Sequence, residues 1–169
     1  MDYIRILLCT LVLSAYTSYP AAVSPVENFE LSRYLGKWYE VARLDHRFER
    51  GLSQVSAEYR LRDDGGIAVI NRGFNAEKGR WQQAEGRAYF VSEPTRGHLK
   101  VSFFGPFYAS YVVFGLGDDY QYAFVSGPGH DYLWLLAREP HVSQQVWQAF
   151  VERATEAGFD TAALIRAEP

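Results

Sequence analysis

Most of the chain after residue 36 alternates between apolar and polar positions with a period of two. Residues 55–61, for example, place Val55, Ala57 and Tyr59 on one face. This period is typical of β-strands, because successive side chains of a strand point to opposite faces. The pattern predicts eight strands, at residues 37–43, 54–61, 67–75, 80–92, 98–103, 108–116, 120–126 and 132–137.

The joins between these strands are mostly short. Residues 63–66, Asp-Asp-Gly-Gly, form a typical hairpin turn, since Asp and Gly tolerate the left-handed backbone that such turns require. Short connections make neighbouring strands antiparallel. A sheet of eight long, twisted strands can close into a barrel, and closure leaves no strand with unpaired backbone groups at an edge. We therefore predict an all-β fold, an eight-stranded antiparallel up-and-down β-barrel. The alternative is a two-sheet sandwich, which favours long Greek-key connections that this sequence does not show.

Two helical stretches flank the predicted strands. A short helical pattern over residues 30–35 ends at Gly36. Near the C-terminus, Ser143 is a fair N-cap, an apolar stripe follows at helical spacing, and Gly158 ends the helix. We expect this single C-terminal α-helix to pack outside the barrel rather than on a membrane or partner. Residues 159–167 should add a short extended piece.

Small side chains on the predicted inner faces leave space inside the barrel. An eight-stranded barrel can hold one small ligand, and residues 44–53 would cross its open end. A purely structural protein would instead fill the barrel with large side chains. The ligand-binding wall is predicted to comprise Ala57, Tyr59, Ala84, Gly86, Ala88, Phe90, Leu99, Val101, Phe103, Tyr111, Val113, Tyr132 and Trp134.

The N-terminus has the character of a targeting segment. Arg5 gives a weakly positive start, the apolar run over residues 6–15 is too short to span a bilayer, and small residues follow. We expect a signal peptide at residues 1–22 and one domain at residues 23–169. The alternative is a buried first strand.

Cys9 is the only cysteine in the chain, so the mature protein is expected to contain no disulfide. Bacterial lipoproteins are acylated on a cysteine that closes the apolar run of the signal. Here the apolar run continues beyond Cys9, which fits a lipoprotein signal poorly. Whether Cys9 carries a lipid is left open.

Composition and motifs narrow the classes of function. A net charge of −3, with no run of Lys or Arg, argues against nucleic acid as a partner. The sequence has no Gly-x-Ser-x-Gly motif, phosphate loop or metal-spaced His pair, so no catalytic residue, cofactor or metal is predicted. The four histidines are scattered, which indicates loop or strand-surface positions: His46, His98, His130 and His141.

Glu40 is the acidic residue with the most informative position. It shares a predicted face with Trp38 and Ala42, so its carboxyl group should point inward. A buried carboxyl group needs a partner or a raised pKa. Three roles stay open: a structural hydrogen bond at the barrel wall, an anchor for a ligand head group, or a catalytic acid.

Three short motifs together resemble those of the lipocalin family. Gly36-Lys37-Trp38-Tyr39 after a helical turn resembles the first signature, and Arg138 at the end of the last strand resembles the third. Residues 117–123 resemble the second, an acidic–aromatic turn, although Asp119 stands where an aromatic residue is usual. The resemblance covers residues 29–169 and is greatest to the bacterial outer-membrane lipoprotein lipocalins, akin to apolipoprotein D. It is carried by residues 33–40, 45–52, 62–66 and 101–107.

This resemblance implies a barrel-closure set of Gly36, Trp38 and Arg138, in which the guanidinium stacks over the indole. Such a contact contributes about 0.5–2 kcal/mol. The resemblance also implies that the protein binds, stores or transports a hydrophobic ligand, a fatty acid or lysophospholipid, in the bacterial cell envelope. Because catalytic motifs are missing from the sequence, we expect that it is not an enzyme. A lipocalin-type enzyme acting on a lipid and a structural envelope protein are the alternatives.

The expected location is the periplasm or cell envelope after export, with a lipid anchor in the outer membrane as the alternative. Beyond the hydrophobic ligand, association with a membrane surface and a homodimer are left open as partners.

We predict that export removes the signal peptide, so that the mature chain begins between about residues 16 and 25. Mass spectrometry of the envelope fraction measures this directly. An uncleaved Met1, or a diacylated Cys9, would contradict the prediction.

Overall fold

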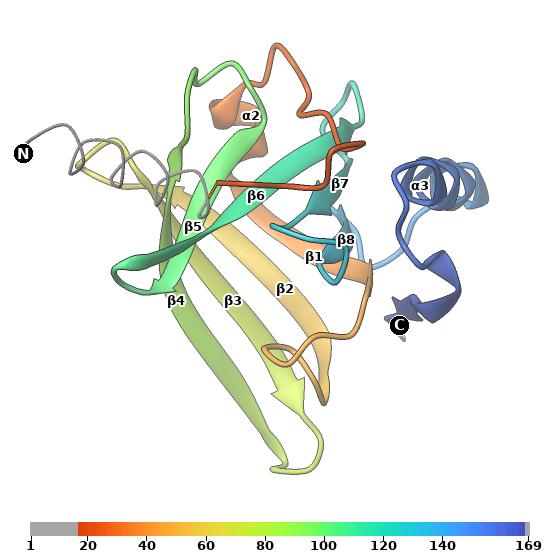
Figure 1. Ribbon diagram of the computed structural model, residues 1–169. Coiled ribbons are helices and arrows are strands. Elements are labelled where there is room, and N and C mark those ends of the chain that lie inside the picture. Colours follow the sequence, from red (N-terminus) through yellow and green to blue (C-terminus); the bar gives the residue numbers. More distant parts are fainter. Residues whose placement is uncertain (1–16, 168–169) are drawn as a thin grey trace, which may run out of the picture.

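Eight antiparallel strands close into a barrel in the computed structural model, which describes residues 17–167 (Figure 1). Each strand pairs with the next along the chain, and β1 pairs with both β2 and β8. This closure confirms the predicted fold. The strands are β1 (Gly36–Arg43), β2 (Leu52–Leu61), β3 (Ile67–Asn75), β4 (Arg80–Phe90), β5 (His98–Phe104), β6 (Phe107–Leu116), β7 (Tyr122–Ser126) and β8 (Leu133–Ala137).

The observed strand bounds lie within two residues of the predicted ones. The start of β7 shows why some differ. Tyr120 adopts a left-handed backbone with φ of 57°, and its N–H bonds to the carbonyl of Gly117. This turn keeps residues 117–121 out of the sheet, so β7 begins at Tyr122 instead of residue 120.

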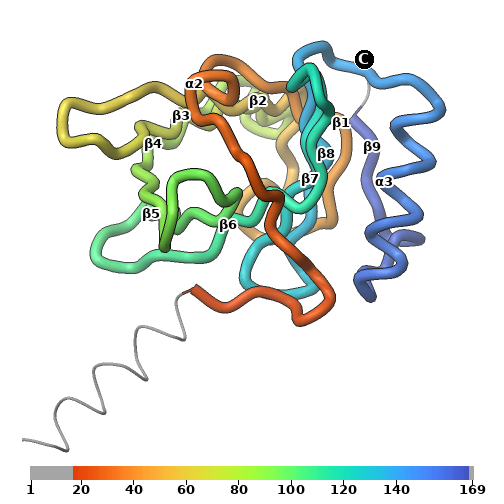
Figure 2. The backbone as a smooth tube through the Cα atoms, turned by 90° about the horizontal axis from the view of Figure 1, so that it is seen from above, coloured from red at the N-terminus to blue at the C-terminus, as the bar shows by residue number. Residues whose placement is uncertain are grey.

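Successive connections alternate between the two ends of the barrel (Figures 1 and 2). At one end lie α2 (Leu31–Tyr34) and the segment before it, which crosses the strands in Figure 2. The N–H of Val26 bonds to Val113, and the N–H of Phe29 bonds to Thr95, so this segment is tied to the barrel. The opposite end is surrounded by residues 44–51 and by the β3–β4 and β5–β6 turns.

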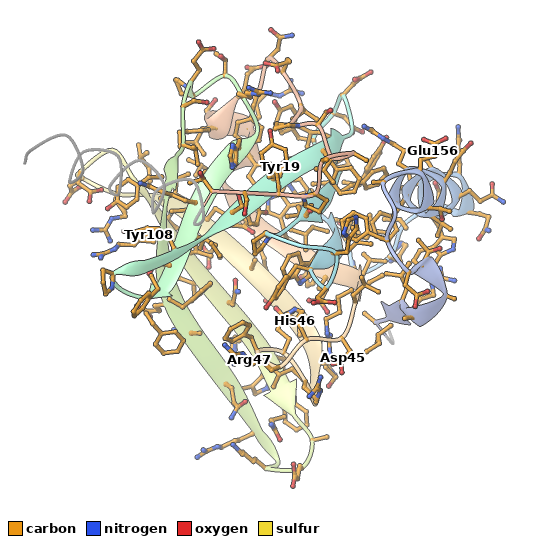
Figure 3. The ribbon with its side chains drawn as sticks, viewed as in Figure 1. Tyr19, Asp45, His46, Arg47, Tyr108 and Glu156 are labelled. Carbon is orange, nitrogen blue, oxygen red and sulfur yellow. The ribbon has the colours of Figure 1, made fainter. Side chains whose placement is uncertain are left out.

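Tyr19 and Pro20, within the predicted signal peptide, pack against the rest of the protein. Pro20 is buried, and the ring of Tyr19 meets that of His98 edge-on with centroids 4.9 Å apart (Figure 3). The rest of the predicted signal, with Cys9, lies outside the described residues.

A β-bulge changes the inward face of β1 between Glu40 and Ala42. Trp38 and Glu40 belong to the interior as predicted, but Ala42 lies in the apolar cluster outside the barrel. The extra residue shifts the alternation by one position, so Arg43 is also directed inward, where it meets Glu40. The predicted common face is therefore wrong at Ala42.

α3 (Gln144–Glu156) packs on the outside of the barrel, as expected. Ser143 accepts a backbone N–H as the predicted N-cap, and Gly158 follows the helix with φ of 87°. Phe150 is fully buried, with its ring 5.2 Å from that of Phe124 in the sheet. Among residues 17–167, no helix is both long enough and apolar enough to cross a membrane.

The expected extended piece near the C-terminus is β9 (Ile165–Arg166), which follows a 3₁₀ turn, η1 (Thr161–Ala163). It pairs with Ala42 and Arg43 of β1, beyond the point where the pairing of β1 with β2 has ended at Tyr39. β9 therefore covers the part of β1 that would otherwise be an exposed edge.

Arg138 joins three chain segments at the end near α2. Its guanidinium carbon lies 3.8 Å from the centroid of the Trp38 ring. Its nitrogens donate to the carbonyls of Arg33 at 2.7 Å, Lys37 at 2.9 Å and Tyr120 at 3.2 Å. A Cβ on Gly36 would lie 3.4 Å from the guanidinium, and its φ of 95° also favours glycine.

We expect Arg138→Ala to lower the free energy of unfolding by about 1–3 kcal/mol, because it removes the cation–π contact and leaves three carbonyls without this donor. Urea denaturation measures the loss. Arg138→Lys keeps the charge but not the planar guanidinium, so its free energy of unfolding should lie between those of the wild type and Arg138→Ala. An Arg138→Ala protein as stable as the wild type would contradict this role.

Candidate functional site

The barrel interior contains a cavity that extends from α2 to the loop of residues 44–51. The centres of water-sized molecules can occupy about 110 Å³ of it. One water needs only about 10–15 Å³ by this measure, so the cavity has room for a larger molecule. Its lining is mostly apolar, with a few polar side chains described below.

Eight of the thirteen predicted wall residues line this cavity: Ala57, Tyr59, Ala88, Leu99, Val101, Phe103, Tyr111 and Trp134. They come from β2, β4, β5, β6 and β8, so the walls on opposite sides of the barrel both contribute. Their common feature is an inward position in the two-residue alternation.

The other five predicted wall residues lie outside the lining: Ala84, Gly86, Phe90, Val113 and Tyr132. Ala84 is exposed because β4 extends beyond its pairing with β5, which begins at Arg87. A Cβ on Gly86 would lie 2.9 Å from the ring of Phe103, so that ring already occupies the space above the glycine.

The remaining three pack against neighbours. Phe90 lies 6.0 Å from the ring of Phe29 near α2, and Val113 is fully buried in the interior cluster. Tyr132 stacks on Trp134 at 6.2 Å.

The predicted wall did not include several residues that line the cavity: Leu31, Tyr34, Glu49, Val55, Ile67, Val69, Asn71, Val125 and Leu136. Ile67, Val69 and Asn71 alternate along β3, so the period of two could have identified them. Tyr34 and Glu49 come from a helix and a loop, where no such period applies.

Three tyrosines form a hydrogen-bonded chain inside the cavity. The hydroxyl of Tyr111 lies 2.6 Å from that of Tyr34 and 2.8 Å from that of Tyr59. Burial raises the pKa of all three phenols, so they are neutral donors at physiological pH. Three O–H groups share two hydrogen bonds, which leaves one O–H without an acceptor among the residues that the structure describes.

Asn71 adds an unused acceptor to the same wall. Its Oδ1 is buried and has no hydrogen-bond partner within residues 17–167. Asn71 pairs with Ala57 across β2 and β3, two positions from the Val69–Tyr59 pair. Its amide is therefore a diagonal neighbour of Tyr59, and the cavity offers both a donor and an acceptor.

A second polar cluster lies where the loop of residues 44–51 meets the cavity. Arg43 Nη1 lies 2.5 Å from Glu40 Oε1, and a carboxylate oxygen of Glu49 lies 2.8 Å from His46 Nε2. The same Glu49 oxygen accepts the indole N–H of Trp134 at 3.0 Å. Figure 3 shows His46 beside Asp45 and Arg47 in this loop.

The pKa values of the two carboxyl groups in this cluster are shifted in opposite directions. Burial raises the pKa of Glu40 to about 8, and the neighbouring charge of Glu49 adds to the effect, which Arg43 only partly offsets. Burial also acts to raise the pKa of Glu49, but the hydrogen bonds from His46 and Trp134 outweigh it and lower the pKa overall. Burial thus favours the protonated form of Glu40, whereas hydrogen bonds favour the ionised form of Glu49.

Among residues 17–167, no group of three or more His, Cys, Asp or Glu side chains is arranged to hold a metal ion. His46, His130 and His141 lie in loops as predicted, although His46 is buried, whereas His98 is buried in β5 instead of lying on a strand surface. His98 bonds to Ser110 at 2.8 Å, and the more exposed His130 contacts the carbonyl of Ala157 at 3.0 Å.

Comparisons with known proteins find a family model and relatives that match most of the chain. Residues 29–169 match a family model described as a lipocalin-like domain. The chain is 60% identical over 166 residues to the outer membrane lipoprotein Blc of Vibrio cholerae, covering 98% of this chain and 97% of that protein. It is 56% identical over 146 residues to the Blc protein of Escherichia coli K12, covering 86% and 82%.

A solved structure agrees at the level of the fold. Insecticyanin from the tobacco hornworm Manduca sexta superposes with a TM-score of 0.70, covering 91% of this chain and 88% of that one. The sequence identity is 22%, so this likeness concerns the architecture alone.

We predict that Glu40 makes the protein less stable as pH rises. A folded-state pKa of about 8 lies above the usual 4.5, so the contribution of Glu40 is complete below pH 4.5 and is lost as pH rises through about 8. The loss should be on the order of 2–4 kcal/mol. Denaturation midpoints between pH 5 and 9 measure it.

Glu40→Gln, which cannot ionise, should remove most of this slope. Glu58→Gln is the matched control, because Glu58 is an outward-facing acid of β2 that is paired with Arg60. Equal slopes for the wild type and Glu40→Gln would refute the prediction.

Proposed function

Since the chain belongs to the lipocalin family, we propose that its barrel binds one single-chain lipid, a fatty acid or a lysophospholipid, and stores or carries it in the bacterial cell envelope. The observation that carries this proposal is the cavity itself: a mostly apolar space, closed at one end by Arg138 and Trp38, with polar groups at defined places.

The apolar walls would supply most of the affinity. Each buried CH₂ contributes about 0.8 kcal/mol before the costs of ordering the chain and of association. Leu99 and Val101 of β5 and Val69 of β3 line the cavity together with Leu136 of β8, so an acyl chain would contact apolar side chains from several parts of the wall.

The polar groups suit a ligand with an oxygen-containing head. The spare tyrosine O–H can donate to a carbonyl, ester or hydroxyl oxygen, and Asn71 Oδ1 can accept from a hydroxyl. At the mouth, Arg47 and Arg50 are exposed, and Arg50 already pairs with Asp45 at 2.8 Å. Arg47 is therefore the freer of these two cations for an anionic head group.

We further propose that the protein binds without catalysing a reaction. Glu40 and Glu49 are the two acids in the cavity lining, and both are engaged by Arg43, His46 or Trp134. This arrangement suits a fixed polar wall. A structural envelope protein is less consistent with an interior that retains open space.

The names of the relatives support the proposed location. Both Blc proteins are named outer membrane lipoproteins, which suits an exported chain that acts at the envelope. Tyr19 and Pro20 pack on the barrel, which favours processing on their N-terminal side. Cys9, the residue in question for an anchor, lies outside the described residues.

Ligand binding can be tested by filling the cavity. Ala88 is buried in the lining, so Ala88→Trp or Ala88→Leu should occupy the space and weaken binding of long-chain fatty acids and lysophospholipids at least tenfold. Native mass spectrometry of protein purified from cells, followed by titration with both lipid classes, measures this.

Ala68→Trp is the matched control, because Ala68 lies on the adjacent strand and outside the cavity lining. The affinity of Ala68→Trp for both lipid classes should match that of the wild type. If neither lipid class binds the wild type below roughly 100 μM, where the binding free energy is only about −5.5 kcal/mol, the lipid-carrier proposal fails. Conversion of a lipid during incubation would instead favour the enzyme alternative.

A further inference from the structure

Three tyrosine hydroxyls lie at the base of the cavity, which is its closed end near α2. Tyr34 ends α2, and its ring centroid lies 4.8 Å from that of Trp38. Tyr59 pairs with Gly36 at the start of β1, and its ring centroid lies 5.4 Å from that of Tyr34. The hydroxyl of Tyr111 bonds to both of the others, so all three meet at this end.

The surrounding contacts fix the Tyr34 ring in place. Its centroid lies 5.1 Å from that of the buried Phe29, and the carbonyl of Tyr34 accepts the indole N–H of Trp38 at 2.8 Å. Phenylalanine at the three tyrosine positions would fill the same space without removing three hydroxyl groups from water, which is costly. The hydroxyls therefore need an explanation beyond packing.

The hydroxyl cluster has hydrogen-bonding capacity to spare. Each phenol can donate one hydrogen bond and accept others, and the three phenols share only two bonds among residues 17–167. One O–H hydrogen and several oxygen lone pairs are therefore left over, whichever way the two bonds run. A neutral hydroxyl group complements this set, because it both accepts and donates.

The charge of the lining determines which part of a lipid can reach the base. In the part of the chain that the structure describes, no Arg, Lys or His lines the cavity, whereas two acids do, Glu40 and Glu49. The guanidinium of Arg138 is outside the lining and donates to three backbone carbonyls. A carboxylate or phosphate among the tyrosines would have no free cation beside it, which is unfavourable in a buried site. An anionic head group therefore stays towards the mouth, and the base receives a neutral group further along the chain.

We propose that Tyr34, Tyr59 and Tyr111 form a subsite for a hydroxyl group near the far end of the acyl chain, so that the preferred ligand is a fatty acid hydroxylated away from its carboxylate. The ligand oxygen accepts the spare phenol O–H, and the ligand O–H donates to a phenol oxygen. This assignment rests on the proposed function, because the acyl chain has to lie in the barrel with its head group outward.

A plain acyl chain matches this subsite less well. Its terminal methyl group leaves the spare donor unpaired, and a site built to bond a hydroxyl discriminates against an analogue that lacks it. A water molecule can satisfy the same phenols, and the hydroxyl of a bound chain reproduces the hydrogen bonds of the water that it displaces. A methyl group cannot reproduce them.

Titration calorimetry of the wild type tests the proposal with plain fatty acids, from lauric to stearic acid, and with their ω-hydroxy derivatives. At the chain length that places the hydroxyl among the tyrosines, the ω-hydroxy acid should bind roughly threefold or more tightly than the plain acid. The preference should fall at shorter and longer lengths. The α-hydroxy acids should show no preference, because their hydroxyl lies beside the carboxylate.

The triple variant Tyr34→Phe, Tyr59→Phe, Tyr111→Phe removes the hydroxyls and keeps the rings. Because both partners of each hydrogen bond are removed, the fold should be retained, and plain fatty acids should bind at least as tightly as they bind the wild type. The ratio of ω-hydroxy to plain affinity should fall about tenfold or more.

Tyr89→Phe is the matched control. The Tyr89 hydroxyl donates to Asp64 at 2.8 Å, outside the cavity lining, so the affinity ratio of this variant should equal that of the wild type.

The outcomes separate this subsite from the proposed function. Binding of plain acids with no preference for an ω-hydroxyl at any length would overturn the subsite and leave the lipid-carrier function standing. No binding of either series, or of lysophospholipids, would refute the proposed function as well.

Three further results would overturn the subsite: an equal preference for α-hydroxy acids, an unchanged affinity ratio in the triple variant, or an equal loss of the ratio in Tyr89→Phe. The comparison of ω-hydroxy with α-hydroxy acids needs only the wild type, so it remains decisive even where the triple variant fails to fold.

Discussion

The guanidinium of Arg138 is the contact on which the arrangement of the cavity depends. It connects residues about 100 positions apart, because it bonds to the carbonyls of Arg33 and Lys37 and stacks on Trp38. The Trp38 indole in turn donates to the carbonyl of Tyr34 at 2.8 Å. Tyr34 begins the hydroxyl chain inside the cavity, so the closure of the barrel and the placement of its innermost polar groups follow from one set of contacts.

The β-bulge in β1 has a comparable effect at the other end. Without the extra residue, Arg43 would point away from the interior. In its observed position, its guanidinium bonds to Glu40 and to the carbonyls of Glu49 and Leu52 at 3.1 and 3.2 Å. A buried cation is tolerated only with such partners. The loop of residues 44–51 is thereby held against the cavity, and its Glu49 becomes part of the wall.

The sequence predicted the structural features that recur along the chain and missed those that depend on a single position or on tertiary contacts. Period-two alternation identified all eight strands, and the turn and cap residues identified most connections, because these signals are local. The face of Ala42 could not be predicted, since a bulge leaves no mark in the hydrophobic pattern. Ala84 and Gly86 show the same limit, because whether an inward residue reaches the cavity depends on how far β5 extends beside β4 and on the ring of Phe103.

The two ends of the barrel therefore have different roles in a protein that binds a hydrophobic ligand. The α2 end is fixed by Arg138, whose bonds span distant segments, and it gives the cavity a rigid base. The mouth consists of connections between strands, and such loops open locally at a lower free-energy cost than the strands they join. A ligand must pass this mouth, and Glu49 on its loop is held by side chains rather than by a strand ladder. Opening the mouth would break a few side-chain contacts and leave the sheet intact, so entry of a hydrophobic ligand need not disturb the closure at the other end.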